Sequence, residues 1–216
     1  MDAALETLAR ADGVTGELTL RRRVAADPRV DPVYELIVDG VFLMDTAETS
    51  TERLLADAVL DRLAVPRRIL VGGMGLGVTL AALLTDVRVD RVDVVEIEPL
   101  LVRWLRAGLV PPVDAVLADP RVHVTVADIS DVLRDVVINT YDGVLLDVDN
   151  GPDFLVRAAN AAVYRNASMR DVWPRTSSPV SVVSNTSSIV SLPRAWPTNC
   201  FTLSPEPEGA SVVFRS

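Results

Sequence analysis

The sequence predicts an α/β protein in which a small N-terminal β unit precedes a mostly parallel sheet. From about residue 66 onward, strand-like and helix-like segments alternate, the pattern of a parallel sheet with right-handed crossovers. Before about residue 50, apolar and polar residues alternate over short segments, as in half-buried antiparallel strands. The chain has 216 residues, enough for one large domain with an appendage at roughly 150 residues per domain. We therefore expect a β unit over residues 1–50 and a sheet domain over residues 51–216.

The β unit is expected to hold two or three antiparallel strands. Gly16–Val24 and Val33–Asp45 alternate apolar and polar residues, and a turn that contains proline and aspartate separates them. Thr51–Leu63 follows with leucine, alanine and valine at helical spacing. Ser50 and Thr51 are the candidate N-cap residues of this helix because their hydroxyls can accept a backbone hydrogen bond.

The sheet domain is predicted from four apolar runs with helices between them. The fourth run is almost continuously apolar, which indicates a strand buried on both faces. The predicted strands are Arg68–Gly73, Val92–Ile97, Arg121–Val126 and Gly143–Leu146. The predicted helices are Leu76–Leu84, Glu98–Ala107 and a short one from Ser130.

The last 50 residues give weaker patterns. A helix over Ala158–Trp173 and a fifth strand over Val180–Val183 are expected. Cys200–Leu203 and Ser211–Phe214 could form a closing hairpin. The last strand of the sheet is expected to run antiparallel to the others.

Composition excludes several classes of chemistry. The chain contains no lysine, which excludes Schiff-base catalysis. It also excludes P-loop nucleoside triphosphatases and kinases that depend on a lysine. Cys200 and His123 are the only residues of their types, so neither a disulfide framework nor a His/Cys zinc site is expected, and we predict no metal. Acidic residues exceed basic ones for a formal charge of −9, which argues against nucleic acid and an anionic membrane surface as partners.

The start of the chain is acidic and lacks the pattern of a signal peptide. No apolar run approaches the roughly 20 residues that span a bilayer. We therefore expect a cytoplasmic protein that has no membrane partner.

Four glycines fall between the first strand and the first helix of the sheet domain. They are Gly72, Gly73, Gly75 and Gly77 in the segment VGGMGLGVTL. Glycine lets the backbone approach a ligand closely, and the helix N-terminus behind it offers free N–H groups. The segment is typical of a binding turn, although a tight turn without a ligand would look similar. Its spacing departs from the G-x-G-x-x-G fingerprint of dinucleotide-binding folds.

Acidic residues end the next three strands. Glu96 lies about twenty residues after the glycines, where a carboxylate can accept two hydrogen bonds from a ribose diol. Asp128 can accept a hydrogen bond from an adenine amine or cap the helix that follows. Asp147 ends the fourth strand, where open α/β sheets bind ligands, or it caps the next turn. With Asp149 close by, it predicts an acidic entrance suited to an amine, whose proton Asp147 could accept.

These segments together resemble the spermidine synthase (polyamine aminopropyltransferase) family. The resemblance is carried by VDGVFLMDTAETSTE, VGGMGLGVTL, VEIEP, VTVADI and LLDVDNGPDFLV, in the expected order from about Glu35 to Tyr164. In particular they resemble a bacterial branch with GGxGxG and DNGP motifs. The resemblance implies a seven-stranded, Rossmann-like sheet of the S-adenosylmethionine-dependent methyltransferase type behind a small N-terminal β domain, with residues 51–216 as the nucleoside-binding domain.

The resemblance also assigns roles to the motif residues. It implies that the glycine turn and Glu96 hold an adenosyl donor, Asp128 its adenine, and that Asp147 is the catalytic aspartate. Candidates for weaker contacts with the acceptor are Asp149, Asn150, Asp45 and Glu52. The family usually assembles through its N-terminal region, so a homodimer is expected by analogy.

The chain departs from the family pattern at three positions that face the transferred group and the acceptor. Well-studied members carry an aspartate where this chain has Gly75, a Tyr-His-Glu motif where it has Ser50-Thr51-Glu52, and a second aspartate where it has Asn150. The nucleoside contacts are retained. The sequence therefore supports nucleoside binding more strongly than it supports putrescine as the acceptor.

Three functional hypotheses remain open at this point. The first is transfer of an alkyl group of the aminopropyl type from an adenosyl sulfonium donor to a small amine other than putrescine. The second is a small-molecule methyltransferase that uses S-adenosylmethionine itself, instead of its decarboxylated form. The third is a nucleoside-binding protein without catalysis. For the enzymes we expect direct displacement, because alignment of an activated donor already lowers the barrier substantially.

Overall fold

A computed structural model describes residues 4–135, 140–148, 180–184 and 211–215. These residues form two sheets, one in the N-terminal unit and one in the sheet domain. The predicted helix over Ala158–Trp173, the strand over Cys200–Leu203, and the candidate residues Asp149 and Asn150 lie outside the described residues. No helix in the described part of the chain has the length and apolar character needed to cross a membrane.

The N-terminal sheet holds four antiparallel strands in the order β1-β2-β3-β4, not the predicted two or three. Their bounds are β1 Ala4–Asp12, β2 Glu17–Val24, β3 Val33–Val38 and β4 Val41–Asp45. The predicted strand over Val33–Asp45 is a hairpin, because Asp39 and Gly40 both have positive φ and turn the chain. Strand β1 lies at the sheet edge and is mostly exposed, so its sequence lacks a clear alternation.

The second sheet has six described strands in the order β10-β9-β8-β5-β6-β7. Neighbouring strands from β9 to β7 are parallel, and β10 is antiparallel to β9, as expected for the last strand. The predicted count of seven is not reached within the described residues. The bounds are β5 Arg68–Gly72, β6 Arg91–Glu96, β7 Val122–Val126, β8 Gly143–Leu146, β9 Val180–Ser184 and β10 Ser211–Arg215.

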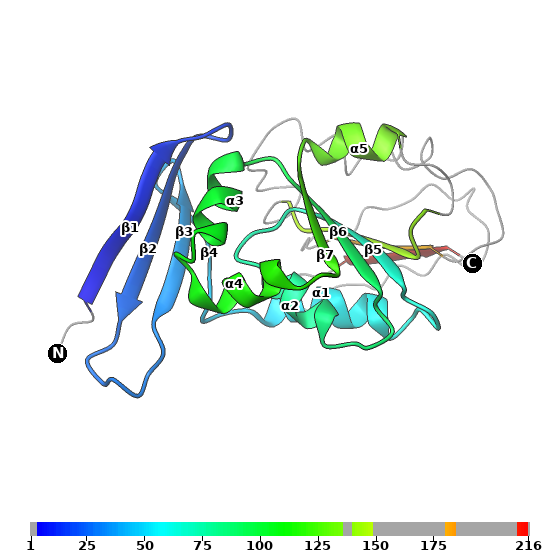
Figure 1. Ribbon diagram of the computed structural model, residues 1–216, viewed down its shortest axis with the longest axis horizontal. Helices are drawn as coiled ribbons and strands as arrows, with labels where there is room; N and C mark the ends of the chain where they lie inside the picture. Colours follow the sequence, from blue (N-terminus) through cyan, green and yellow to red (C-terminus); the bar gives the residue numbers. More distant parts are fainter. Residues whose placement is uncertain (1–3, 136–139, 149–179, 185–210, 216) are drawn as a thin grey trace.

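Five described helices accompany this sheet, and Figure 1 shows that α1, α2 and α4 lie on one side of it and α5 on the other. Their bounds are α1 Ser50–Leu60, α2 Val78–Leu84, α3 Pro99–Arg106, α4 Pro111–Ala118 and α5 Ile129–Asp135. Figure 1 also shows α3 beside the N-terminal sheet. Helix α4 was not predicted, and it begins with two prolines. They occupy the first turn, where a helix makes no use of their missing N–H groups.

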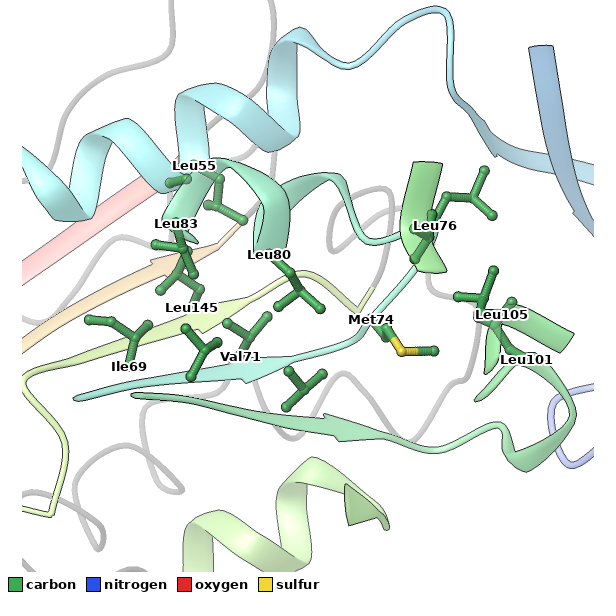
Figure 2. Packing of buried hydrophobic residues seen from close by; sticks show 14 of the residues in the cluster. Leu55, Ile69, Val71, Met74, Leu76, Leu80, Leu83, Leu101, Leu105 and Leu145 are labelled. Atoms are coloured by element: carbon green, nitrogen blue, oxygen red, sulfur yellow. The ribbon is translucent and has the colours of Figure 1, made fainter. Parts of the chain in front are cut away.

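Two apolar clusters hold the layers together. Residues of α1, α2, α3 and α4 join one face of the sheet in the larger cluster (Figure 2), and α5 covers the opposite face. Along β5, Ile69 and Val71 enter the first cluster and Leu70 the second. Side chains of β8 also enter both clusters, Leu145 the first and Val144 and Leu146 the second. Burial on both faces explains the continuous apolar sequence of this strand.

The strand order places a topological switch point beside β5. From β5 the chain continues through β6 to β7 on one side, and β8 then pairs on the other side of β5. Open α/β sheets bind ligands outside the carboxyl ends of strands at such a point. The segments that follow β5, β6, β7 and β8 therefore surround the expected binding region.

Candidate functional site

A cavity lies at the carboxyl ends of β5, β6, β7 and β8. The sheet domain lines it through the segments after these strands and through α1 and α3, and the N-terminal sheet closes it from the other side. From the sheet domain come Glu52, Gly73, Gly75, Val95, Glu96, Ile97, Glu98, Leu101, Ala127, Asp128, Ile129, Asp147 and Val148. From the N-terminal unit come Thr15, Leu18, Leu36, Val38, Leu43 and Met44.

Two of the four predicted glycines line the cavity. At Gly73 φ is +90°, and a Cβ there would lie 2.0 Å from the carbonyl oxygen of Asp147, so no other residue fits between the ends of β5 and β8. At Gly75 φ is +49°, and a Cβ would lie 2.7 Å from the sulfur of Met44. The thioether of Met44, from β4, thus covers the glycine turn.

The other two glycines serve packing instead. A Cβ on Gly72 would lie 2.7 Å from Ile129, and one on Gly77 would lie 2.7 Å from Val113. Neither glycine lines the cavity. They let α5 and α4 approach the turn closely, which is a structural requirement separate from ligand contact.

Glu96 lies at the end of β6 with only 6% of its surface exposed. Its two carboxylate oxygens accept hydrogen bonds from the backbone N–H groups of Met74 (2.8 Å) and Glu98 (2.8 Å). Burial raises the pKa of the Glu96 carboxyl, while these two N–H groups act in the opposite direction. Each carboxylate oxygen can accept more than one hydrogen bond, so Glu96 can hold the glycine turn and still receive ligand hydroxyls.

Asp128 follows β7, caps the helix after it and lies on the cavity wall. One carboxylate oxygen accepts a hydrogen bond of 2.8 Å from the backbone N–H of Ser130 and so caps the start of α5. The residue also lines the cavity. This hydrogen bond fixes the direction of the Asp128 side chain, which follows the strand next to β6.

Asp147 follows β8 and is held on two sides. Its backbone N–H donates to the carbonyl of Gly72 (2.7 Å), and its carboxylate accepts a hydrogen bond of 2.9 Å from the hydroxyl of Thr79. Thr79 lies in the first turn of α2 and is 2% exposed. A carboxylate is thus fixed in the cavity beside the glycine turn.

Glu52 brings a second carboxylate to the same end of the cavity. It lies in the first turn of α1 and is 8% exposed. Within the described part of the chain, no other residue donates a hydrogen bond to its carboxylate. Burial raises the pKa of the Glu52 carboxyl, and the charges of Asp147, Glu48 and Asp45 raise it further. An acidic group in this setting is suited to a cationic ligand.

The structure places Asp45 differently from the other acidic candidates. Its carboxylate accepts hydrogen bonds from the backbone N–H groups of Ala47 (2.9 Å) and Glu48 (2.8 Å) and lies 3.7 Å from the guanidinium of Arg23. It does not line the cavity. Asp45 therefore shapes the turn before α1.

Thr15, Met44 and Glu98 are among the residues of the cavity wall that sequence reasoning missed. Thr15 and Met44 reach the cavity only because the N-terminal sheet packs against the sheet domain, and no motif signals that contact. Glu98 had a signal, since an acidic residue directly before a proline is typical of a helix N-cap. Its carboxylate accepts a hydrogen bond of 3.0 Å from the N–H of Leu100 in α3.

The chain is similar in sequence to curated spermidine synthases. It is 29% identical over 113 residues to spermidine synthase 1 of Hyoscyamus niger, spermidine synthase 2 of Datura stramonium and the spermidine synthase of Solanum lycopersicum. The match covers 52% of this chain and 33–36% of those relatives, so it spans about a third of their length. No family model matches the chain.

Solved structures show the same fold. A spermidine synthase in complex with the transition-state analogue AdoDATO has a TM-score of 0.62 at 16% identity and covers 83% of this chain and 58% of its own. The Thermotoga maritima spermidine synthase has a TM-score of 0.62 at 17% identity, over 83% and 57% of the two chains. The sequence comparison confirms the spermidine synthase-like resemblance, and the solved structures confirm the fold.

Proposed function

We propose that this protein is a transferase that moves an aminopropyl group from decarboxylated S-adenosylmethionine to a small amine, with methylthioadenosine as the second product. One observation carries the proposal. The described lining of the cavity contains five carboxylates and no basic side chain, and the carboxylates are Glu52, Glu96, Glu98, Asp128 and Asp147. The similarity to spermidine synthases in sequence and fold supports the same reaction.

The acidic lining favours the decarboxylated donor over S-adenosylmethionine itself. Both donors carry a sulfonium and an ammonium, but S-adenosylmethionine adds a carboxylate. In a partly buried cavity, like charges within a few ångströms repel by several kcal/mol. Among the described lining residues, no arginine is present to offset that repulsion. The donor without that carboxylate therefore fits this cavity better.

The nucleoside end of the donor is assigned to the glycine turn, Glu96 and Asp128. Gly73 and Gly75 line the cavity, so the adenosyl group is proposed to lie against the backbone of this turn. Glu96 is proposed to accept hydrogen bonds from the ribose hydroxyls, and Asp128 one from the adenine amine. Gly72 and Gly77 support this site through packing.

Asp147 is proposed to act on the acceptor amine. In the transfer, the amine nitrogen forms a bond to the propyl carbon next to sulfur, and the carbon–sulfur bond breaks with its electron pair left on the sulfur. The proton lost by the amine goes to the Asp147 carboxylate and then to solvent. Because the sulfonium is already an activated leaving group, alignment and a neutral amine are sufficient.

Glu52 is the strongest candidate for binding the acceptor beside Asp147. Its buried carboxylate, without a partner among the described side chains, can receive the ammonium of an amine substrate. Asp149 and Asn150 are proposed contacts because they follow Asp147 in the chain. Asp45 is a weaker candidate, since turn N–H groups already occupy its carboxylate. The departures at Ser50, Thr51 and Asn150 argue for an amine other than putrescine.

A methyltransferase remains the second candidate because of Gly75. The aspartate that the family resemblance places here would meet the amine of the donor's aminopropyl group. In this chain Met44 fills that space with a thioether. An apolar group at that point removes one contact specific to aminopropyl transfer, and the competing reaction predicts tighter binding of S-adenosylmethionine.

The proposal is tested by assaying methylthioadenosine release from decarboxylated S-adenosylmethionine with a panel of mono- and diamines. The native protein should release it only when an amine is present. Asp147→Asn should lower the rate at least about 100-fold, with methylthioadenosine affinity within about twofold. Asp131→Asn is the matched control, since this exposed carboxylate on α5 pairs with Arg134 and does not line the cavity. Binding of methylthioadenosine without turnover with any amine would instead indicate a nucleoside-binding protein without catalysis.

A further inference from the structure

A continuous set of hydrogen bonds joins the glycine turn to the N-terminal unit. The N–H of Met74 donates to Glu96, which also accepts from the N–H of Glu98. The side chain of Glu98 then accepts from the N–H of Val14 (2.7 Å), and from the N–H (3.3 Å) and hydroxyl (3.4 Å) of Thr15. Glu98 is more than 80 positions away from Val14 and Thr15 in the chain. The carboxylates of Glu96 and Glu98 thus link the glycine turn to the N-terminal unit.

The geometry around Glu98 leaves little freedom for another arrangement. Its surface is 2% exposed. One carboxylate oxygen accepts a hydrogen bond from the N–H of Leu100 in α3. The other accepts one from the N–H of Val14 in the turn between β1 and β2. A Cβ on Gly13 would lie 2.3 Å from that second oxygen, so glycine is needed for the turn to approach. Buried carboxylates are stabilised by such multiple N–H donors.

The β1–β2 turn in turn places Thr15 on the cavity wall. The other lining residues from the N-terminal unit are leucine, valine and methionine, so Thr15 is the one polar side chain that the described unit contributes. The hydroxyl of Thr15 bonds Glu98, whose own N–H bonds Glu96. Glu98 therefore holds the part of the wall that Thr15 provides.

We propose that Glu98 is a positioning residue that holds the β1–β2 turn over the nucleoside end of the cavity. This inference rests on the proposed function, because it requires a nucleoside in contact with Glu96. When the ligand engages Glu96, the linked hydrogen bonds of Glu98 are ordered with it, so ligand binding and docking of the N-terminal unit reinforce each other. Glu98 acts through the turn and has no part in proton transfer.

Glu98→Gln tests this role. An amide keeps one acceptor oxygen, and its NH₂ group would face N–H donors on the other side of the side chain. We expect hydrogen exchange at the amides of Val14 and Thr15 to accelerate at least about tenfold and the Kd of methylthioadenosine to rise about tenfold. At saturating donor, kcat should fall by a smaller factor than the Kd rises, because Asp147 and Thr79 are untouched.

Gly13→Ala is the second variant, in case the buried substitution at Glu98 prevents folding. It leaves Glu98 intact and pushes the turn away from it, so exchange and Kd should change in the same direction. Glu17→Gln is the control. Its carboxylate pairs with Arg10 on the exposed side of the same unit, and neither measurement should change.

The outcomes separate this inference from the proposed function. Faster exchange with an unchanged Kd would overturn the positioning role and leave the proposed function standing. Unchanged exchange in both variants would overturn the contact between Glu98 and the turn. If the native protein does not bind methylthioadenosine, the nucleoside site itself is wrong and the positioning role falls with it, even where exchange responds.

Discussion

The hydroxyl of Thr79 donates a hydrogen bond of 2.9 Å to the carboxylate of Asp147. This contact joins the first turn of α2 to the end of β8, and Thr79 is buried. The threonine therefore sets the direction of the carboxylate that we assign to the acceptor amine. A fixed direction matters because displacement at carbon requires the nucleophile in line with the leaving group.

Thr79→Val removes this hydroxyl and keeps the shape of the side chain. We expect kcat to fall about tenfold, because one hydrogen bond to a charged group is lost and the carboxylate can rotate. The Kd of methylthioadenosine should stay within about twofold. Steady-state rates and calorimetry check both values.

Thr85→Val is the matched control, because the exposed Thr85 hydroxyl at the end of the same helix donates to the backbone carbonyl of Ala82. Equal losses of kcat in the two variants would show that helix stability, and not the direction of Asp147, explains the effect.

Gly73→Ala should abolish nucleoside binding and destabilise the protein by more than about 3 kcal/mol. The added methyl group would meet the backbone carbonyl of Asp147 at 2.0 Å, and backbone cannot move aside as a flexible side chain can. Chemical denaturation gives the free energy of unfolding, and calorimetry gives the affinity for methylthioadenosine.

Gly40→Ala provides the comparison for that variant. Gly40 has a φ of +76°, but a Cβ there would meet nothing within 4 Å. Its cost should therefore be the backbone strain alone, about 1 kcal/mol. If both alanine variants cost the same, the close approach of β5 and β8 is not what requires Gly73.

Glu52→Gln should make stability less dependent on pH. Burial raises the pKa of Glu52 in the folded state, so between its ordinary value and the raised one the folded protein binds more protons than the unfolded chain. Stability conferred by this group is then full below the ordinary pKa and declines as pH rises through the raised value. The glutamine variant removes this decline, and unfolding free energies from pH 4 to pH 8 measure the difference. A decline of equal slope in both proteins would contradict the burial of an uncompensated carboxylate.

Much of the sheet domain could be predicted because strands and helices alternate along the chain, and the parallel strands all end at one edge of the sheet. The strand Gly143–Leu146 has the predicted bounds, and Glu96, Asp128 and Asp147 meet at one cavity because parallel strands end at the same edge. Helix α4 was missed, although proline in the first turn is compatible with a helix. The hairpin at Asp39 and Gly40 was missed although an Asp-Gly pair between two apolar runs is a hairpin signal.

The parts of the site that come from the N-terminal unit could not be predicted. Met44 and Thr15 reach the cavity through packing between two sheets, which no local pattern encodes. Asp45 and Glu52 were equally acidic candidates in the sequence, yet turn N–H groups occupy one carboxylate and the other faces the cavity. Whether a carboxylate stays available to a ligand depends on the hydrogen-bond donors that surround it in the folded protein.

The acidic lining of the cavity is tested most directly by calorimetric titration with decarboxylated S-adenosylmethionine, S-adenosylmethionine and methylthioadenosine. The decarboxylated donor should bind at least about tenfold more tightly than S-adenosylmethionine, because the extra carboxylate meets uncompensated negative charge. Methylthioadenosine should bind as well, through the nucleoside contacts alone. Tighter binding of S-adenosylmethionine would contradict the aminopropyl donor and favour methyl transfer, and binding of none of the three would contradict the nucleoside site.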